Sequence, residues 1–275
     1  MRVPLLCCAA LIVLSACGSD DDNGELAVLT YNVAGLPQGI SKSDPERTIP
    51  LISPLLDAHD LVLVQEDFAY HDALSAQVTL PYKSVHRAQG PGGGRLGDGL
   101  NRFSRAPFRE HTRESYTRCN GLVDSGSDCL AAKGFTHAVH ELAPGVEVIV
   151  YNTHLDASGS DEDQAARSAQ VDELLASLKS HDAAVILGGD TNLKPSRGID
   201  GETLSRLRAQ GKLDDACLAL DCGDVERIDR IYFRSSASVR LEAVSWQVDR
   251  RYVDADGKDL SDHEAVAVHI RWQRR

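Results

Sequence analysis

Short apolar runs that each stop abruptly at a polar residue constrain the fold of this chain more than any other feature. Three such runs span residues 26–31, 61–64 and 183–187. Because these runs are continuously apolar and do not alternate with polar residues, we expect strands that are buried on both faces. Such strands must be covered on both sides, which predicts an α/β fold.

Further strands and two helices complete this prediction. The additional strands are expected at residues 135–142, 146–152, 228–233, 239–248 and 264–272. Helices are expected at residues 47–58 and 161–180. The second helix has acidic residues in its first turn, and we expect it to pack on a sheet through an apolar face formed by Ala165, Ala169, Leu174, Leu175 and Leu178.

Polar side chains gather at the ends of the expected strands, where functional sites of α/β proteins form. They are Asn32, Gln65, Glu66, Asn152, His154, Asp156, Asp190, Asn192, Asp229, Asp262 and His263. Carboxylate and amide oxygens suit Mg²⁺, Mn²⁺ or Ca²⁺, and a histidine beside an aspartate can act as a base. Taken singly, each residue could cap a turn or stabilise the fold, but together they predict a metal-dependent active site.

The beginning of the chain has the composition of an export signal. Arg2 precedes an apolar run at residues 3–14 that is too short to span a bilayer. The following Leu14-Ser15-Ala16-Cys17 resembles the bacterial lipobox, which implies a lipoprotein signal peptide over residues 1–16 and lipidation of Cys17. The alternative is an ordinary signal peptide with a chance cysteine.

Residues 17–24 are polar and charged and are expected to be a flexible tether. Residues 25–275 then form one catalytic domain, large enough for a single core. These features predict an exported bacterial lipoprotein of the cell envelope, at the outer membrane or cell surface, held to the membrane by its lipid. Loss of residues 1–16 removes Arg2 and takes the formal charge from −12 to −13. This acidity counts against a dedicated nuclease, because proteins that bind nucleic-acid phosphates usually have a basic face.

Four cysteines remain between the tether and the C-terminus, and an even number in an exported protein favours disulfides. The pairing expected from their proximity in sequence is Cys119 with Cys129 and Cys217 with Cys222. A zinc site is the alternative, but the spacings lack the close Cys-x-x-Cys pairs of structural zinc sites.

Six ordered motifs resemble the endonuclease/exonuclease/phosphatase superfamily. They are Tyr-Asn-Val (31–33), Gln-Glu (65–66), Asn-Thr-His-Leu (152–155), Gly-Asp-Thr-Asn (189–192), Ile-Asp-Arg-Ile (228–231) and Ser-Asp-His (261–263). The resemblance covers the chain from Leu26 almost to its C-terminus. It implies a four-layer α/β/β/α sandwich, in which two packed β-sheets are flanked by helices and the active site lies where the sheets meet.

The resemblance also implies a role for each residue. The metal, Mg²⁺ or else Mn²⁺ or Ca²⁺, would be held by Glu66 and Asn32, and Asp262 would orient His263 or approach the metal. His263 would be the general base for an attacking water, and Asp229 would fix its tautomer. Asp190 would help to place the nucleophile. Asn192 and His154 would hold the phosphoryl oxygens.

Within the superfamily, three groups remain open. His154 in Asn-Thr-His-Leu favours the branch of pancreatic-type deoxyribonucleases, bacterial sphingomyelinases and phosphoinositide phosphatases. Asp229-Arg230-Ile231 resembles the phosphoinositide phosphatases, but their preceding Pro and Trp are missing, and Ala34 stands where abasic-site nucleases carry a carboxylate. Residues 97–100 and 128–135 resemble bacterial sphingomyelinases. We therefore expect a monomeric metal-dependent phosphodiesterase whose substrate is a phospholipid such as sphingomyelin. A secreted endonuclease acting on DNA is one alternative, and an inactive lipid-anchored binding module is another.

Overall fold

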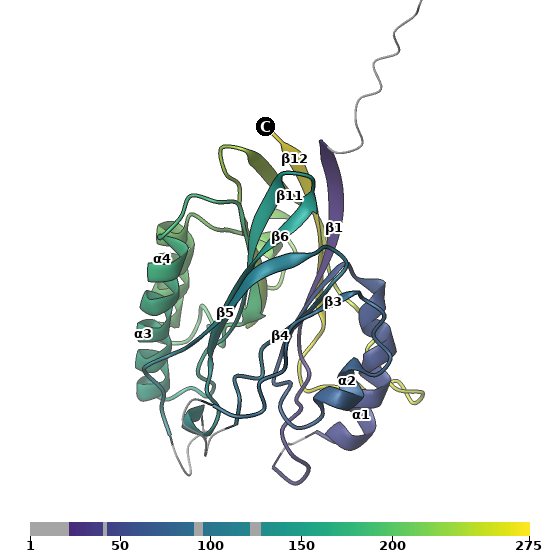
Figure 1. The fold of residues 1–275 in the computed structure, drawn as a ribbon. Coiled ribbons are helices and arrows are strands. Elements are labelled where there is room, and N and C mark those ends of the chain that lie inside the picture. Colours follow the sequence, from purple (N-terminus) through teal and green to yellow (C-terminus); the bar gives the residue numbers. More distant parts are fainter. Residues whose placement is uncertain (1–21, 41–42, 91–95, 122–127) are drawn as a thin grey trace, which may run out of the picture.

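Two six-stranded β-sheets form the centre of the computed structural model, which describes residues 22–40, 43–90, 96–121 and 128–275 (Figure 1). The strand order of the first sheet is β11-β12-β1-β2-β4-β3. Its strands are β1 (Asn23–Asn32), β2 (Leu61–Gln65), β3 (Tyr82–Lys83), β4 (Asn101–Ser104), β11 (Val239–Val248) and β12 (Val266–Arg274). The strand order of the second sheet is β5-β6-β7-β8-β10-β9. Its strands are β5 (Phe108–Ser115), β6 (Gly134–Ala143), β7 (Val146–His154), β8 (Val185–Asp190), β9 (Asp214–Asp215) and β10 (Asp229–Arg234).

Helices cover the outer face of each sheet, so the prediction of a four-layer sandwich is confirmed (Figure 1). The first sheet is covered by α1 (Pro45–Ile52), the 3₁₀-helix η1 (Ser53–Ala58) and α2 (His71–Ser75). The second sheet is covered by α3 (Asp161–Leu178) and α4 (Asp200–Gly211). Two short elements, η2 (Asp128–Leu130) and α5 (Ala216–Ala219), lie in connections.

Alternate residues of the central strands point to opposite layers, as the period of two in a β-strand requires. In β2, Leu61 and Leu63 pack between the sheets, whereas Val62 and Val64 pack under the helices of the first sheet. Both sets are buried, which explains why the strand is continuously apolar in sequence. At Gly188 of β8 an added Cβ would lie 2.7 Å from Cδ1 of Leu63. A glycine is therefore needed there for the two sheets to approach.

The predicted helix at residues 47–58 is wrong in part. The α-helical hydrogen bonding ends at Ile52, and the chain tightens into η1, which has a proline in its first turn. Pro54 has no N–H with which to continue an α-helix, so a change of helix type here follows from its chemistry.

The predicted apolar face of the helix at residues 161–180 is also wrong in part. Ala165 is exposed and Ala169 is half-buried, whereas Arg167 and Gln170 are fully buried. Arg167 forms a two-pronged ion pair with Asp200 of α4, with both N–O distances at 3.0 Å. A buried polar side chain is tolerated where all its donors are satisfied, and hydrophobicity alone cannot identify such a position.

The predicted signal peptide, Cys17 and most of the tether lie outside the described residues. No helix within the described ranges is both long enough and apolar enough to cross a membrane. Both expected disulfides are present. Cys119 is bonded to Cys129, and Cys217 to Cys222, with Cα–Cα distances of 5.4 and 4.9 Å.

Polar side chains join the two sheets at one end of the core between them. Gln65 of β2 donates to Oδ1 of Asn152 in β7 at 2.7 Å, and Asn152 donates back to the Val64 carbonyl at 2.9 Å. Arg102 of β4 is fully buried and donates to the Val150 carbonyl of β7 at 3.1 Å. Burial, together with the charge of nearby Arg113, lowers the pKa of Arg102 to about 9. These bonds between the sheets fix how the strand ends face one another.

We predict that Gln65→Ala lowers the free energy of unfolding by about 1–3 kcal/mol, because the buried Oδ1 of Asn152 loses its donor. Urea denaturation measures this change. Gln247→Ala is the matched control, since Gln247 is exposed on β11 and should shift stability by less than about 0.5 kcal/mol. Equal effects of the two substitutions would show that the bond between the sheets does not stabilise the fold.

Candidate active site

The inward-facing rows of five strands converge at the carboxyl ends of β1, β2, β7 and β8 and at the start of β10. β1 runs parallel to β2 and β7 runs parallel to β8, whereas β10 is antiparallel to β8. The register places His154 opposite Asp190 and Asp229 opposite Asp190. Because each strand alternates its faces, Asn32, His154, Asp190 and Asp229 are the polar ends of the rows that form the core between the sheets.

Asn32 brings groups from both sheets together. Its Nδ2 lies 3.1 Å from Oε1 of Glu66 and 3.2 Å from Oδ2 of Asp190. Nε2 of His154 lies 3.3 Å from the same Asp190 oxygen, and 4.0 Å from Oε1 of Glu66. The first sheet thus contributes an amide and a carboxylate, and the second sheet contributes a carboxylate and an imidazole.

Two residues of the site have a left-handed backbone, which side chains other than glycine adopt at a cost. Glu66 has φ +57° and Asn192 has φ +51°. In a regular strand, Glu66 would continue the outward row of Val62 and Val64. The left-handed turn instead allows its carboxylate to reach Asn32.

His263 is held by carboxylates at both ring nitrogens. Nδ1 lies 2.9 Å from Oδ2 of Asp229, and Nε2 lies 3.7 Å from Oδ2 of Asp190. The pairing with Asp229 is the one expected from the sequence. Asp262 is exposed, and the two carboxylates beside the His263 nitrogens belong to Asp229 and Asp190. Its role as a metal ligand stays a prediction.

The carboxylates set the ionisation of this pair. Burial alone would lower the pKa of His263, but Asp229 and Asp190 outweigh it and raise the pKa to about 10. Burial would raise the pKa of Asp190, but His263 and His154 hold it well below its usual range. Burial raises the pKa of Asp229, and the Asp190 charge adds to that effect. His263 is therefore cationic at neutral pH until the surrounding negative charge is compensated.

The residues fit a divalent cation. Asp190, Asp229 and His263 each offer a donor atom, and these atoms all lie within 4.8 Å of one another. Oδ1 of Asp229 is buried, and no group of the described residues hydrogen-bonds to it. An unsatisfied carboxylate oxygen beside a second buried carboxylate is costly, and a hard cation would satisfy it. Glu66 is a third carboxylate of the site, because the Asn32 amide that donates to Asp190 also donates to Glu66.

The two residues expected to hold phosphoryl oxygens lie at the same place. His154 is buried against Asp190. Nδ2 of Asn192 donates to the Leu155 carbonyl at 3.2 Å, and its backbone N–H donates to Oδ1 of Asp190 at 3.0 Å. One amide donor of Asn192 therefore fixes the loop after β7. Its contact with a phosphoryl group stays a prediction.

Sequence reasoning missed Lys133, whose Nζ donates to the Leu155 carbonyl at 3.0 Å. The side chain is buried, and its charge contributes to the low pKa of Asp190. In the sequence, Lys133 was marked only by its position within residues 128–135, the segment that resembles bacterial sphingomyelinases.

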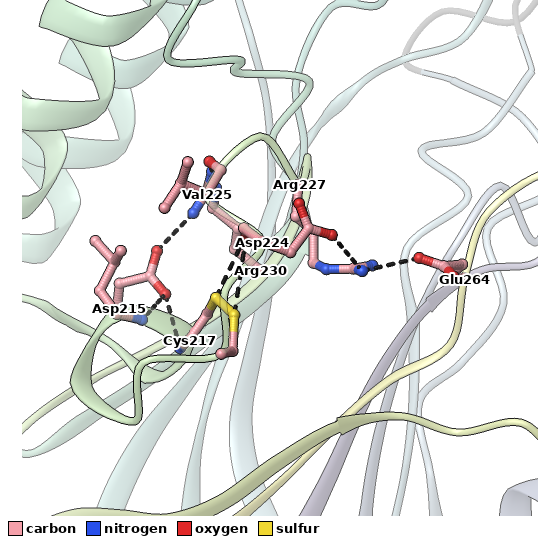
Figure 2. Close-up of a disulfide and its surroundings, with 9 residues drawn as sticks. Asp215, Cys217, Asp224, Val225, Arg227, Arg230 and Glu264 are labelled. Carbon is pink, nitrogen blue, oxygen red and sulfur yellow. Dashed lines mark hydrogen bonds and ion pairs between the residues drawn. A yellow bond between two sulfur atoms is a disulfide. The ribbon is translucent and has the colours of Figure 1, made fainter.

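Arg227 was also missed. It forms ion pairs with Asp224 at 2.7 Å and with Glu264 at 2.8 Å (Figure 2). The guanidinium also lies 5.0 Å from the ring centroid of Trp246. Cys217 of the second disulfide contacts the Asp224 carbonyl at 3.4 Å (Figure 2). Arg227 thus joins the segment before Asp229 to the residue after His263, and both segments line an open pocket formed by Lys194, Asp224, Glu226, Arg227, Ile228, Asp229, Asp262, His263 and Glu264.

A model of the Endonuclease/Exonuclease/phosphatase family matches residues 29–263, a span that contains every residue of the site. The chain belongs to this family. Among curated relatives, it is 30% identical to the sphingomyelinases of Mycobacterium bovis and Mycobacterium tuberculosis over 274 residues. These matches cover 92% of this chain and 54% of those proteins, so the chain spans about half the length of the curated relatives it matches.

Three solved structures of the same fold are informative. The Staphylococcus aureus beta toxin F277A, P278A mutant with bound magnesium ions has a TM-score of 0.65 and 19% identity, covering 89% of this chain and 99% of that one. Sphingomyelinase C from Streptomyces griseocarneus has a TM-score of 0.62 and 21% identity, covering 90% and 99%. D. rerio TDP2 complexed with single strand DNA product has a TM-score of 0.69 and 19% identity, covering 90% and 98%. At these identities the likeness establishes the fold.

We predict that His263→Ala lowers kcat on a chromogenic phosphodiester by about 10²–10⁴-fold, because the group placed to accept a proton is lost. Thermal denaturation should show a folded protein of similar Tm. His269→Ala is the matched control, because His269 is exposed on β12 and should leave kcat unchanged. A fully active His263→Ala protein would place the base elsewhere.

Proposed function

We propose that this member of the family is an exported, divalent-metal-dependent phosphodiesterase that hydrolyses its substrate by in-line attack of a water activated by His263. The observation that carries the proposal is the pair of His263 and Asp229 beside the buried carboxylate of Asp190. The family match and the sphingomyelinase relatives support a phosphoric ester hydrolase.

The proposed reaction needs a group that accepts a proton from water and groups that bind the cation. Asp229 accepts a hydrogen bond from Nδ1 of His263 and so presents Nε2 as the atom that takes a proton from water. Glu66 and Asp190 would hold the cation, with Asn32 beside them as the amide that donates to both carboxylates, and with Asp229 or Asp262 as further ligands. When bound, Mg²⁺ would supply positive charge to the phosphoryl oxygens as negative charge accumulates on them. It would also compensate the carboxylates that keep His263 protonated, and so favour the neutral imidazole that a base requires.

A phospholipid diester such as sphingomyelin is the proposed substrate. Two observations support this substrate. The mycobacterial relatives are sphingomyelinases, and this chain has a formal charge of −12. A polyanion such as DNA is repelled by an acidic protein except at local positive charge, whereas a zwitterionic phosphocholine group is not.

Attachment to a membrane is part of the same proposal. A lipid on Cys17 and a short tether would hold the catalytic domain beside a bilayer, where a phospholipid substrate is concentrated. We propose a monomer at the cell envelope, because the site is assembled from side chains of a single chain.

A two-substrate assay tests this proposal. Purified protein with Mg²⁺ should release phosphocholine from sphingomyelin vesicles at a rate well above that of plasmid nicking. Excess chelator should abolish both reactions, and re-added Mg²⁺ should restore them. Because His263 is part of the proposed chemistry, the His263→Ala protein is the control for contaminating enzymes.

Efficient plasmid nicking without release of phosphocholine would replace the lipid substrate with DNA. Turnover that persists in excess chelator would exclude the metal-dependent reaction. Absence of any hydrolysis of lipid, DNA or chromogenic diester, despite Mg²⁺, would favour a binding module that retains only the fold.

A further inference from the structure

A second cluster of metal-ligating side chains lies one residue beyond Glu66 and takes no part in the proposed reaction. Asp67, His71 and His86 each offer a donor atom, and these atoms all lie within 4.8 Å of one another. Nδ1 of His71 lies 2.6 Å from Oδ2 of Asp67, and Nε2 of His86 lies 3.1 Å from the backbone carbonyl of Asp67. The three residues come from three segments: the turn after β2, the start of α2 and the loop after β3.

The two imidazoles are arranged as a pair. The rings of His71 and His86 are stacked, with centroids 4.4 Å apart and an interplanar angle of 4°. Because the lone pair of an imidazole nitrogen lies in the plane of its ring, one of the two rings must rotate for both to bind the same ion. Both side chains are half-buried, whereas the Asp67 side chain is only 2% exposed. An ion could therefore reach the imidazoles from solvent and meet a carboxylate behind them.

Neighbouring groups hold the carboxylate in place. Nδ2 of Asn101 donates to Oδ2 of Asp67 at 2.7 Å, and Oδ1 of Asn101 accepts from Arg113 at 2.8 Å. The backbone N–H of Asp67 donates to the Gly99 carbonyl at 3.1 Å. Hydrogen bonds of this kind commonly orient metal ligands and fix the direction of their lone pairs.

The donor set differs in chemistry from that of the active site. The active site is rich in carboxylate and amide oxygens, which suit Mg²⁺. Two imidazoles and one carboxylate suit a first-row transition-metal ion, with one coordination position left for water. We infer that Asp67, His71 and His86 form a binding site for a transition-metal dication such as Zn²⁺, separate from the active-site cation.

An ion at this site would tie together three segments that the hydrogen bonds now join. It would fix the start of α2 and the loop after β3 against the peptide that follows Glu66. Glu66 has a left-handed backbone, so an ion bound to the adjacent Asp67 would stabilise that strained turn. The site is therefore structural, and its occupancy does not depend on the proposed substrate or reaction.

Metal titration of untagged, metal-stripped protein tests the inference. Equilibrium dialysis should give one tightly bound Zn²⁺ that His71→Ala and His86→Ala each weaken by roughly 100-fold, since each removes one of three ligands. Co²⁺ bound in its place should give visible absorption bands of a low-symmetry site, and these bands should be lost in the same variants. His269→Ala, an exposed histidine on β12, should bind Zn²⁺ as the unchanged protein does.

Two further variants separate this site from its alternatives. Asp190→Asn should keep the tightly bound Zn²⁺, because Asp190 belongs to the active site. His71→Cys replaces one ligand by another and should retain Zn²⁺ and give Co²⁺ a thiolate charge-transfer band, even if His71→Ala fails to fold. Equal Zn²⁺ affinity in the unchanged protein and the folded His86→Ala variant would overturn the inference, as would loss of the tight site in Asp190→Asn alone. The readout is metal binding, so failure of the proposed hydrolysis would leave this result unaffected.

Discussion

The hydrogen bonds of Asn32 to Glu66 and Asp190 are the interactions on which the site depends, because they join the two sheets at the end of their common core. Each sheet alone supplies only part of the site. The first sheet supplies an amide and a carboxylate, and the second supplies two aspartates and an imidazole. The hydrogen bonds of Asn152 with Gln65 and with the Val64 carbonyl, one layer deeper, help to fix how the strand ends of the two sheets face one another. The contacts that pack the two sheets together therefore also position the polar side chains of the site.

This arrangement places two negatively charged carboxylates in the protein interior, where water cannot solvate them. Asp190 and Asp229 are buried side by side across a β-ladder, and the imidazole of His263 lies within 4 Å of both carboxylates. The high pKa of His263 is the direct consequence. A buried acid cluster that depends on the protonation of its own base is poorly suited to catalysis, and a divalent cation resolves the conflict. The clustered carboxylates and the magnesium ions bound in the beta toxin structure of the same fold both support the proposal of a divalent cation at this site.

Much of the fold and the site could be predicted from sequence, because continuous apolar strands and polar strand ends are both local patterns. The strands at residues 61–64 and 183–187 are examples, whereas the pairing of His263 with Asp229 was expected only because the motifs resemble the superfamily. What could not be predicted depends on tertiary partners. Arg167 faces inward only because Asp200 lies opposite it, and Lys133 reaches the site through a carbonyl 22 residues away in sequence. The Asp67, His71 and His86 cluster needs a turn, a helix start and a loop to meet, which no local pattern records.

We propose that one cation site is built from both sheets, and the most direct test is the Mg²⁺ affinity measured by isothermal titration calorimetry. Glu66→Gln alters the first sheet and Asp190→Asn the second, while Glu202→Gln on the exposed side of α4 serves as the control. We expect each of the first two substitutions to weaken Mg²⁺ binding by roughly tenfold or more, and the control to leave it unchanged. Unchanged Mg²⁺ affinity in either Glu66→Gln or Asp190→Asn would contradict a site shared between the sheets.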